Sequence, residues 1–330
     1  MRFTLIGAGR IGANHARILS RIDRVASLRI ADVAPDRAEQ VAASVDEATT
    51  VDLEKAFVDT DAVIITSSTN THAEFLIEAA RTGVAAFCEK PIALDLESTR
   101  RAVAAIDAAG IPVQMGFQRR YDPAMAAIQR AVDDGTLGTP YLIRSQTHDP
   151  EPPPADYIPV SGGIFRDCLI HDIDIVRHVA GQEVVSVDAT GSVVGFPQIG
   201  AHDDFDTAAA VLRMSDGTLA QLSALRHDPM GYDVRLEVFG SKDSMAAGWS
   251  DRTPINSTEP GVAGPTDPIT SFWDRFDSAY EAEMEAFADL IGGRSSQGAT
   301  HHDAYEDLRV AVACDRSAAE ARTVRLEEVT

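Results

Sequence analysis

Four titratable side chains share one face of an otherwise apolar segment. With a step of roughly 100° per residue, a helix over 161–181 places on one narrow stripe Asp167, His171, Asp174 and His178. Aliphatic residues occupy most of the remaining helix surface, which is typical of a largely buried helix with one polar line facing a solvent-filled cavity. Because burying an unpaired charge is costly, the stripe is either a paired ion network or a working site. Imidazoles and carboxylates in such a site could transfer protons or ligate a metal ion.

A metal site is one alternative for the stripe. Asp167 and His171 are spaced i, i+4, with His178 further along, and this pattern could hold zinc or a similar cation. No third ligand is marked nearby on another predicted element, so we expect no metal here. Asp174 and His178 are the members that could be purely structural. Their candidate partners are Arg166, Arg177 and the backbone.

The bulk composition excludes several classes of partner. The 330 residues carry 29 Lys and Arg against 51 Asp and Glu, a formal net charge of −22. Nucleic acids and anionic membranes need clustered basic residues, so neither is an expected partner. Three cysteines without a C-x-x-C pair argue against a disulfide framework or a structural zinc site. No apolar run is long enough for a membrane span or a signal peptide, and we expect a cytoplasmic protein.

The first third of the chain alternates short apolar runs with amphipathic segments. Predicted strands lie at 2–9, 28–33, 61–68, 84–90 and 112–117, and predicted helices include 70–83 and 95–110. Such alternation indicates a doubly wound parallel sheet of the Rossmann type, with helices on both faces. We assign residues 1–120 to this dinucleotide-binding domain.

A glycine-rich turn, GAGRIG, follows the first predicted strand and opens a helix. Its G-x-G-x-x-G spacing suits a dinucleotide, because Gly7 permits the tight turn, Gly9 admits the pyrophosphate and Gly12 allows close packing. The phosphates are expected at the positive N-terminus of that helix. Asp32, about 20 residues further on, could accept the ribose hydroxyls and favour NAD over NADP, or simply cap a turn. The predicted cofactor contacts of the turn are Gly7, Gly9, Arg10, Ile11 and Gly12.

Lys90 stands directly before Pro91, at the carboxyl end of the predicted strand 84–90. Ligands of open α/β sheets bind at these ends, so a lysine in this place is well positioned for chemistry. The alternative is a solvated lysine beside a proline that starts a helix.

The second half changes to longer strands joined by tight turns, of which Asp216-Gly217 is a strong hairpin signal. Predicted strands lie at 139–148, 184–195, 207–214, 218–226, 232–240 and 244–249, and predicted helices at 272–291 and 303–320. We expect an α+β domain over 121–330, with an open, mainly antiparallel sheet that carries helices on one face. The other face is either exposed or the interface of a homo-dimer or homo-tetramer. The residues HHD at 301–303 predict a helix cap at Asp303, with a metal site as the weaker alternative.

Several motifs together resemble the Gfo/Idh/MocA family of oxidoreductases. They are GAGRIGANHA, TSSTNTHAE, EKPIALD and GGIFRDCLIHDID, in an order and spacing that runs from residue 7 to beyond residue 240. The resemblance implies an NAD-dependent dehydrogenase in which Lys90, Asp167 and His171 surround the substrate carbon and the nicotinamide. It also implies cofactor contacts from Ser67, Asn70, His72, Glu89 and Lys90.

Within this family the segments 116–125, 157–174, 223–245 and 271–291 look like those of inositol dehydrogenases. That resemblance adds to the substrate pocket Arg120, Asp149 and Tyr232. The implied reaction is NAD-dependent oxidation of a secondary hydroxyl of a cyclic polyol, in the first place myo-inositol to 2-keto-myo-inositol (scyllo-inosose). Another inositol isomer or a sugar is the alternative substrate, and a non-catalytic dinucleotide sensor is the alternative class.

The chemistry of alcohol oxidation gives a task to each of three side chains. The hydride leaves carbon for the nicotinamide, whereas the hydroxyl proton needs a base. An imidazole titrates near working pH, which suits His171, and a fixed positive charge at the oxygen suits Lys90. Asp167, one helical turn before His171, could orient the imidazole or hold a neighbouring hydroxyl. We expect Lys90 and His171 to converge on one carbon beside the nicotinamide.

Overall fold

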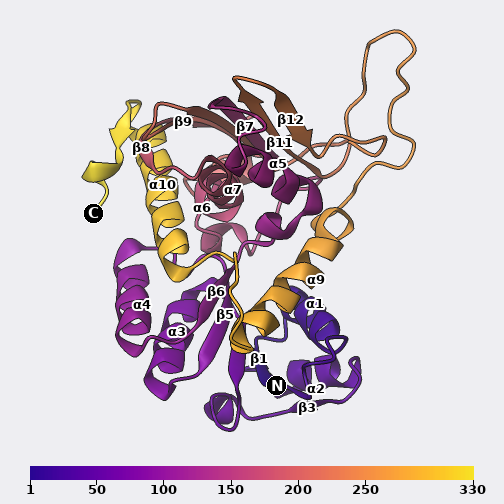
Figure 1. The fold of residues 1–330 in the computed structure, drawn as a ribbon, viewed down its shortest axis with the longest axis vertical. Helices are drawn as coiled ribbons and strands as arrows, with labels where there is room; N and C mark the ends of the chain where they lie inside the picture. The colour runs from indigo at the N-terminus through magenta and orange to yellow at the C-terminus, as the bar shows by residue number, and fades with distance from the viewer. The chain divides into compact units, whose positions relative to one another are not determined.

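The computed structural model describes residues 1–330 and groups them into two units (Figure 1). The first unit comprises residues 1–118 and 278–306, and the second comprises 119–277 and 307–330. The domain boundary that the sequence predicts after residue 120 lies two residues from the division after residue 118. Residues 278–306, which were expected in the second domain, group instead with the first unit.

Six parallel strands form the sheet of the first unit, in the order β3-β2-β1-β4-β5-β6. They are β1 (Arg2–Ile6), β2 (Ser27–Ala31), β3 (Ala48–Thr50), β4 (Ala62–Ile65), β5 (Ala85–Glu89) and β6 (Val113–Gly116). Most residues of the central strands are apolar and buried, as a sheet with helices on both faces requires. This arrangement confirms the predicted doubly wound parallel sheet. The edge strand β3 is short and partly exposed, so sequence periodicity did not reveal it.

Four helices connect these strands, namely α1 (Arg10–Leu19), α2 (Pro35–Ala43), α3 (His72–Thr82) and α4 (Leu96–Ala109). Local chemistry sets the ends of α4. The Asp95 carboxylate accepts the Ser98 N–H at its start, and Gly110 adopts a left-handed conformation with a φ of +63° at its end. The helices predicted near α3 and α4 are confirmed, and the two pack against each other.

The long helix α9 (Phe272–Ile291) explains why residues 278–306 belong to the first unit. The ring of Phe287 is fully buried, and its centroid lies 5.8 Å from those of both Phe3 and Phe87. Figure 1 shows this part of α9 beside α1. An amphipathic pattern indicates that a helix buries one face, but it does not say which sheet covers that face. Like every other helix of the structure, α9 lacks the apolar run needed to cross a membrane.

Seven strands form the sheet of the second unit, in the order β12-β11-β7-β10-β9-β8-β13. They are β7 (Pro140–His148), β8 (Val184–Ser192), β9 (Thr207–Met214), β10 (Leu219–Leu225), β11 (Asp233–Gly240), β12 (Ser244–Ala247) and β13 (Val324–Arg325). Neighbours run antiparallel except β7 and β10, which run parallel. The predicted hairpin joins β9 to β10 at Asp216-Gly217, where Gly217 has a φ of +96°. The mainly antiparallel sheet is therefore confirmed.

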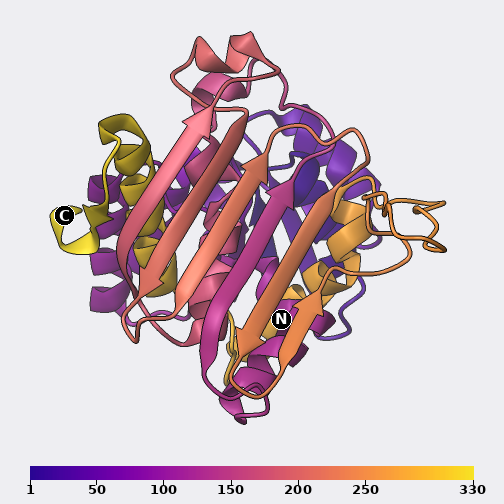
Figure 2. The ribbon, with the colours of Figure 1, turned by 90° about the horizontal axis from the view of Figure 1, so that it is seen from above.

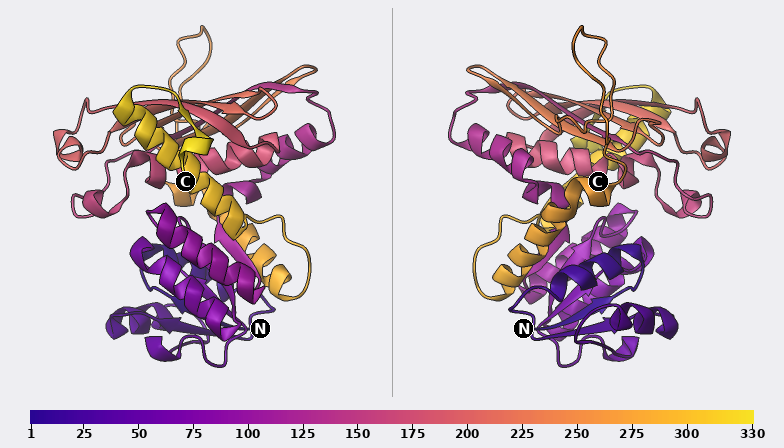
Figure 3. Two further views of the ribbon diagram at one scale, coloured as in Figure 1. Left: turned by 90° about the vertical axis from the view of Figure 1, so that its left-hand side faces the viewer. Right: turned by 90° about the vertical axis from the view of Figure 1, so that its right-hand side faces the viewer.

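Helices cover one face of this second sheet. The unit contains α5 (Pro123–Asp133), α6 (Ile164–Asp167), α7 (Ile170–Ala180), α8 (Pro197–Gly200) and the later part of α10 (His301–Glu320). On β10 the side chains of Ala220, Leu222 and Ala224 are fully buried, whereas Gln221 points to the other side and is exposed. Figure 3 shows α5 and α7 along one side of the sheet, and Figure 2 shows the strands uncovered on the other.

The single helix predicted over 161–181 is in fact two helices, α6 and α7, separated by a turn at 168–169. Gly163, with a φ of +87°, precedes the first helical residue, Ile164. The Leu169 N–H bonds to the Ile164 carbonyl at 3.0 Å, one residue further back than in a regular α-helix. This hydrogen bond spans five residues where a regular α-helix spans four, so the side chains of α7 are rotated about the helix axis relative to those of α6. The prediction of one continuous polar stripe on one helix is therefore wrong.

Candidate functional site

The glycine turn of the first unit has open space at one glycine and close packing at the other two. Gly7 has a φ of +107°, and a Cβ there would lie 2.5 Å from the Ser67 nitrogen. A Cβ on Gly12 would lie 1.9 Å from the Gly7 carbonyl oxygen, whereas a Cβ on Gly9 would meet no atom within 4 Å. Open space at Gly9, at the start of a helix, is what a pyrophosphate group needs.

A cavity of about 390 Å³ borders this turn. Its walls come from the start of α1 and one side of α2, and two of its lining residues are arginines. The positive end of α1 and these cations favour an anionic group. The lining residues are Ala8, Gly9, Arg10, Ala13, Arg37, Gln40, Val41 and Ser44. The predicted cofactor residues Gly9 and Arg10 therefore line a cavity that suits the phosphates of a dinucleotide.

Asp32 follows β2 and ties the end of that strand to the glycine turn. Its Oδ2 accepts the Ala8 N–H at 2.7 Å, and its Oδ1 accepts the Ala34 N–H at 2.8 Å. The turn-capping role that the sequence left open is thus observed. Each carboxylate oxygen keeps a further lone pair that a ribose hydroxyl could use. The ribose contact of Asp32 is compatible with this geometry and stays a prediction.

His72 clamps the loops that follow β4 and β5. The imidazole is buried, with Nδ1 at 2.8 Å from the Pro91 carbonyl oxygen and Nε2 at 2.9 Å from the Ser67 carbonyl oxygen. Burial lowers the pKa of His72, although both carbonyl oxygens favour the protonated ring. The clamp holds the turn at Lys90, where the Lys90–Pro91 peptide is cis. The contact of His72 with the cofactor stays a prediction, whereas its hold on both loops is observed.

Glu89 ends β5 and pairs with a buried histidine that was not predicted as a site residue. Its Oε1 lies 2.7 Å from Nε2 of His15, whose side chain is fully buried. The His15 ring packs edge-on against Phe87 and Tyr280. The signal in the sequence was a histidine on the apolar face of the helix after the glycine turn. The cofactor contact of Glu89 stays a prediction.

The loop after β4 carries two more of the predicted cofactor residues. The Ser67 Oγ and Thr71 Oγ1 atoms are 2.7 Å apart, so one hydroxyl donates to the other. Asn70 is exposed. Both residues lie at the carboxyl end of the sheet, the edge at which open α/β folds bind ligands. Their cofactor contacts, like that of Ile11 at the glycine turn, stay predictions.

In the second unit, the carboxylate of Asp167 at the end of α6 is held on both oxygens. The Tyr157 hydroxyl donates to Oδ1 at 2.9 Å, and Nη1 of Arg226 donates to Oδ2 at 2.7 Å. The Arg226 side chain is 2% exposed and that of Asp167 is 14% exposed, so water screens the pair weakly. Asp167 therefore has a fixed position beside a fixed positive charge. Its predicted influence on His171 stays a prediction.

Arg226 joins side chains that lie far apart in the sequence. Besides Asp167, it donates to Cys168 Sγ at 3.1 Å and to Asp204 Oδ2 at 3.4 Å. Burial by itself would lower the pKa of Arg226, but the groups around it raise that pKa. The Cys168 thiol in turn donates to Asp149 Oδ2 at 3.5 Å. A chain of polar contacts therefore runs from Asp167 to the predicted substrate residue Asp149.

The alternation of β10 carries a sequence signal for Arg226. Every second residue in and after this strand is buried, namely Ala220, Leu222, Ala224 and then Arg226. An arginine at an inward position of an amphipathic strand needs a carboxylate inside the unit. The pattern identifies the strand but not the partner, because the partner carboxylates come from other elements.

A second buried carboxylate, that of Asp172 on α7, was not predicted as a site residue. It accepts from Arg119 Nη1 at 2.9 Å and from the hydroxyls of Ser145 and Thr147, each at 2.5 Å. The Arg119 guanidinium lies beside the hydroxyl of Tyr232, and burial raises the pKa of Tyr232. The predicted substrate residue Tyr232 is therefore a protonated hydroxyl next to a fixed positive charge.

Arg120, another predicted substrate residue, forms a buried ion pair with Asp174. Its Nε and Nη2 atoms lie 3.0 and 2.5 Å from Asp174 Oδ1. The partners predicted for Asp174 were Arg166, Arg177 or the backbone. The ion pair with Arg120 was not among them, and Arg166 and Arg177 pair with other carboxylates. Asp174 is a structural ion-pair member, as the sequence allowed. The substrate contact of Arg120 stays a prediction.

Part of the predicted substrate site is thus brought together within the second unit. Asp149 connects to Asp167 through the contacts of Arg226, and its charge also acts on Tyr232. His171 stands in the first turn of α7 and is partly buried. Lys90 belongs to the first unit. The convergence of Lys90 with His171 stays a prediction.

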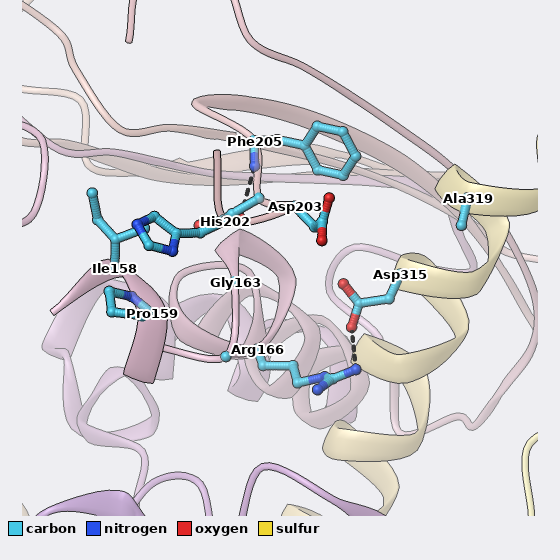
Figure 4. Close-up of a pocket in the computed structure, with 11 residues that line it drawn as sticks. Ile158, Pro159, Gly163, Arg166, His202, Asp203, Phe205, Asp315 and Ala319 are labelled. Atoms are coloured by element: carbon cyan, nitrogen blue, oxygen red, sulfur yellow. Dashed lines mark hydrogen bonds and ion pairs between the residues drawn. The ribbon is translucent and has the colours of Figure 1, made fainter. Parts of the chain in front are cut away.

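A cavity of about 380 Å³ borders α6 (Figure 4). Arg166 and Asp315 form an ion pair of 2.7 Å in its wall, and burial nevertheless raises the pKa of Asp315 to about 6. Asp204, which contacts Arg226, also lines this cavity and accepts the Ile164 N–H at 2.7 Å. No predicted substrate residue lines it. The lining residues are Ile158, Pro159, Gly162, Gly163, Arg166, His202, Asp203, Asp204, Phe205, Asp315 and Ala319.

Two groups of histidine and aspartate side chains are close enough to share a cation. Neither group contains a residue of the predicted polar stripe over 161–181, for which a metal site was the alternative. The first group is Asp107, His301 and His302, and the second is His148, Asp228 and Asp233.

Replacing His72 with Gln should flatten the pH dependence of stability. The pKa of His72 in the folded state lies below the unfolded value of about 6.5, so the neutral ring stabilises the fold above that pH. This stability is lost as the pH falls below the unfolded value. Urea unfolding at about pH 7.5 and about pH 5.5 should show a smaller drop in the free energy of unfolding for His72→Gln than for the wild type. The exposed His227→Gln control should keep the wild-type drop, and an equal drop in His72→Gln would contradict the assignment.

Replacing Arg226 with Met should destabilise the second unit strongly. The variant leaves the carboxylates of Asp167 and Asp204 without their cation, which costs about 3–5 kcal/mol of unfolding free energy. Denaturant unfolding measures this loss. Arg213→Met, at an exposed arginine on β9, is the matched control and should stay within about 0.5 kcal/mol of the wild type. If the free energy of unfolding fell equally in the two variants, the contacts of Arg226 would make no net contribution to stability.

Comparison with known proteins assigns the chain to a family. A family model described as "Oxidoreductase family, NAD-binding Rossmann fold" matches residues 1–117, and one described as "GFO/IDH/MocA C-terminal domain" matches residues 125–246. The inositol 2-dehydrogenase of Rhizobium meliloti is 38% identical over 331 residues, which cover 99% of each chain. The myo-inositol 2-dehydrogenase of Thermotoga maritima is 37% identical and covers 100% of this chain and 99% of its own.

The solved structures agree with the sequence relatives. The scyllo-inositol dehydrogenase of Lactobacillus casei, solved with bound NAD(H) and scyllo-inositol, is 27% identical and covers 99% of each chain with a TM-score of 0.87. The open glycine turn and its cavity fit the same cofactor. With both halves matched in order and relatives aligned over the full length, the chain belongs to the Gfo/Idh/MocA family and is an NAD-dependent dehydrogenase.

Proposed function

We propose that the protein oxidises a secondary hydroxyl of an inositol, with NAD as the hydride acceptor. Relatives aligned over the full length are named for inositol oxidation, and one solved relative holds NAD(H) and scyllo-inositol. The observation that carries the proposal furthest is the Asp167 carboxylate, which Arg226 and Tyr157 hold in place. A fixed carboxylate in the segment that leads to His171 suits the proton transfer that alcohol oxidation needs.

Bound NAD supplies the hydride acceptor, and side chains of this protein supply the rest. In the proposal, His171 accepts the hydroxyl proton, because an imidazole titrates close to neutral pH. Lys90 donates to the same oxygen, and its positive charge stabilises the developing alkoxide. Asp167 stabilises the protonated imidazole or holds a neighbouring hydroxyl, and Arg226 keeps it in position.

A ring that carries many hydroxyls needs several fixed hydrogen-bond partners. The proposed partners are Asp149 as an acceptor, Tyr232 as a protonated hydroxyl and Arg120 as a donor. The contacts of Asp149 with Cys168, and of Tyr232 with Arg119, support this role because they orient two of these groups. A pocket built to bond a given hydroxyl rejects analogues that lack it.

Within this class we propose myo-inositol as the substrate and 2-keto-myo-inositol (scyllo-inosose) as the product. The support is the name of the Thermotoga maritima relative, which shares 37% of its residues with this chain. Another inositol isomer or a sugar is the alternative, since a related structure binds scyllo-inositol. The isomers differ only in the direction of single hydroxyls, so the fine shape of the pocket decides between them.

We infer further that copies of this chain associate as a dimer or tetramer through the open face of the second sheet. Apolar side chains are exposed on that face, among them Val185, Val211 and Trp249. A row of exposed apolar side chains on a sheet favours burial against a partner. The three buried cysteines form no disulfide, which suits a reducing compartment, and we propose the cytoplasm as the location.

Assays with a panel of polyols test the proposed reaction. With NAD and myo-inositol we expect a steady rise in absorbance at about 340 nm as the reduced cofactor forms, and a slower rise with NADP because Asp32 disfavours a 2′-phosphate. A faster rate with scyllo-inositol or an aldose than with myo-inositol would show that myo-inositol is not the preferred substrate. No rate with any inositol or sugar would overturn the proposal and favour a non-catalytic dinucleotide sensor.

Lys90→Ala and His171→Ala should each lower kcat by about 10²–10⁴-fold, because they remove the positive charge and the proton acceptor at the reacting oxygen. NAD should still bind, because the glycine turn and Asp32 remain in place. Steady-state rates measure kcat, and fluorescence titration with the reduced cofactor measures binding. Lys242→Ala and His227→Gln change exposed residues of the same types and should retain wild-type rates. Near-normal turnover in either site variant would remove that residue from its role.

A further inference from the structure

Away from the candidate site, two imidazoles and a carboxylate converge at the start of α10. Nε2 of His301 and Nε2 of His302 lie 2.9 and 3.0 Å from the same atom, Oδ1 of Asp107 in α4. The centroids of the two rings lie 4.4 Å apart, and the ring planes are tilted by 37°. All three residues belong to the first unit.

We propose that Asp107, His301 and His302 form a binding site for a divalent transition-metal ion, with Zn²⁺ as the best fit. Two imidazole nitrogens and one carboxylate oxygen are ligand types that zinc prefers, and the three atoms lie within 4.8 Å of one another. Ligands about 2.0–2.2 Å from a tetrahedral zinc are about 3.3–3.5 Å apart. The observed contacts to Asp107 need to open by only a few tenths of an ångström, and solvent completes the coordination.

The charges around Asp107, His301 and His302 favour a bound cation. The exposed carboxylate of Asp107 supplies one negative charge. The positive end of α10 opposes a cation with about half an elementary charge. Asp303 supplies a second full negative charge at the same helix end, where it accepts from the Thr300 N–H and hydroxyl. The capping residue is Thr300, whose hydroxyl accepts the Asp303 N–H, so the cap predicted within 301–303 lies one residue earlier. Two carboxylates outweigh the helix end.

One atom limits the affinity of the site. Nδ1 of His301 is buried and has no hydrogen-bond partner. A metal-bound imidazole normally donates its other N–H to an acceptor, and the lack of that acceptor costs about 10–100-fold in affinity. The His302 side chain is 59% exposed, so its Nδ1–H can reach water. We therefore expect a site of moderate affinity.

The other candidate cluster, at His148, is less suited to a metal ion because a positive side chain already pairs with one of its carboxylates. Its carboxylate from Asp233 already accepts from the Arg235 guanidinium at 2.8 and 2.5 Å and from Gln146 at 3.0 Å. A guanidinium in that place supplies the positive charge that a metal ion would bring, and it repels a second cation. The Asp107 cluster has only the two imidazoles as its hydrogen-bond donors.

A bound ion would link two parts of the first unit that are distant in the sequence. Asp107 and His301 are separated by 194 positions, and the ion would fasten α4 to the start of α10. Because the unfolded chain does not preform this site, binding adds to the stability of the folded state. At an ion concentration about 100 times the Kd, the ratio of folded to unfolded protein should rise about 100-fold.

Metal titration of the full chain tests the site. The chain is stripped with EDTA, freed of the chelator and titrated with Zn²⁺ by calorimetry and with Co²⁺ by visible absorption. We expect one Zn²⁺ per chain and a tetrahedral Co²⁺ spectrum. His302→Gln and Asp107→Asn, both at exposed side chains, should each weaken Zn²⁺ binding by at least about 10-fold.

Two control variants separate this site from other histidines. His148→Gln changes the second cluster and His227→Gln changes an exposed histidine outside both clusters, and both should bind Zn²⁺ as the wild type does. No binding up to about 1 mM Zn²⁺ would overturn the proposal. Binding that survives both Asp107→Asn and His302→Gln, or that is lost only in His148→Gln, would also overturn it. Because metal binding is the readout, either result leaves the proposed dehydrogenase reaction untouched.

Discussion

The buried guanidinium of Arg226 holds together the part of the second unit in which we propose the chemistry. A buried charge is tolerated only when opposite charges reach it, and Arg226 brings Asp167 and Asp204 together from separate segments. Asp204 also accepts the N–H of Ile164, the first residue of α6. Both ends of α6 are therefore tied to one cation. A helix of four residues, too short to be stable by itself, becomes a fixed support for Asp167.

The same constraint organises the charges of α7. Each of its buried charges has a partner on another element, and one member of the predicted stripe, Asp174, belongs to this ion-pair network. The pairs are Asp172 with Arg119, Asp174 with Arg120, and Arg177 with Asp307. Such networks stabilise a unit only when every member is satisfied, and they then hold neighbouring side chains in one geometry. Asp167 and His171 precede these paired residues in the chain, and they are the residues to which we assign the proton transfer.

In the first unit, hydrogen bonds within the protein fix the loops at the carboxyl ends of the strands. The Asp32 carboxylate holds the glycine turn, His72 ties the loop after β4 to the turn after Lys90, and His15 holds Glu89. Loops that are already ordered lose little conformational entropy when a ligand arrives. The open space at Gly9 and the neighbouring cavity therefore lie between loops that the protein's own hydrogen bonds hold, which suits a dinucleotide site.

The sequence by itself determined both sheets except their short edge strands β3 and β13, and also the glycine turn, the hairpin at Asp216-Gly217 and the position of Lys90 at a strand end, because these follow from local periodicity and turn chemistry. Only the tertiary structure decided that Arg226 meets Asp167 and Asp204, that α9 packs on the first sheet, and that Asp107 meets the histidines of α10. It also decided the break between α6 and α7, which a helical wheel cannot detect. The physical reason is that a pairing between distant residues depends on where folding places each backbone, and spacing along the chain does not record that distance.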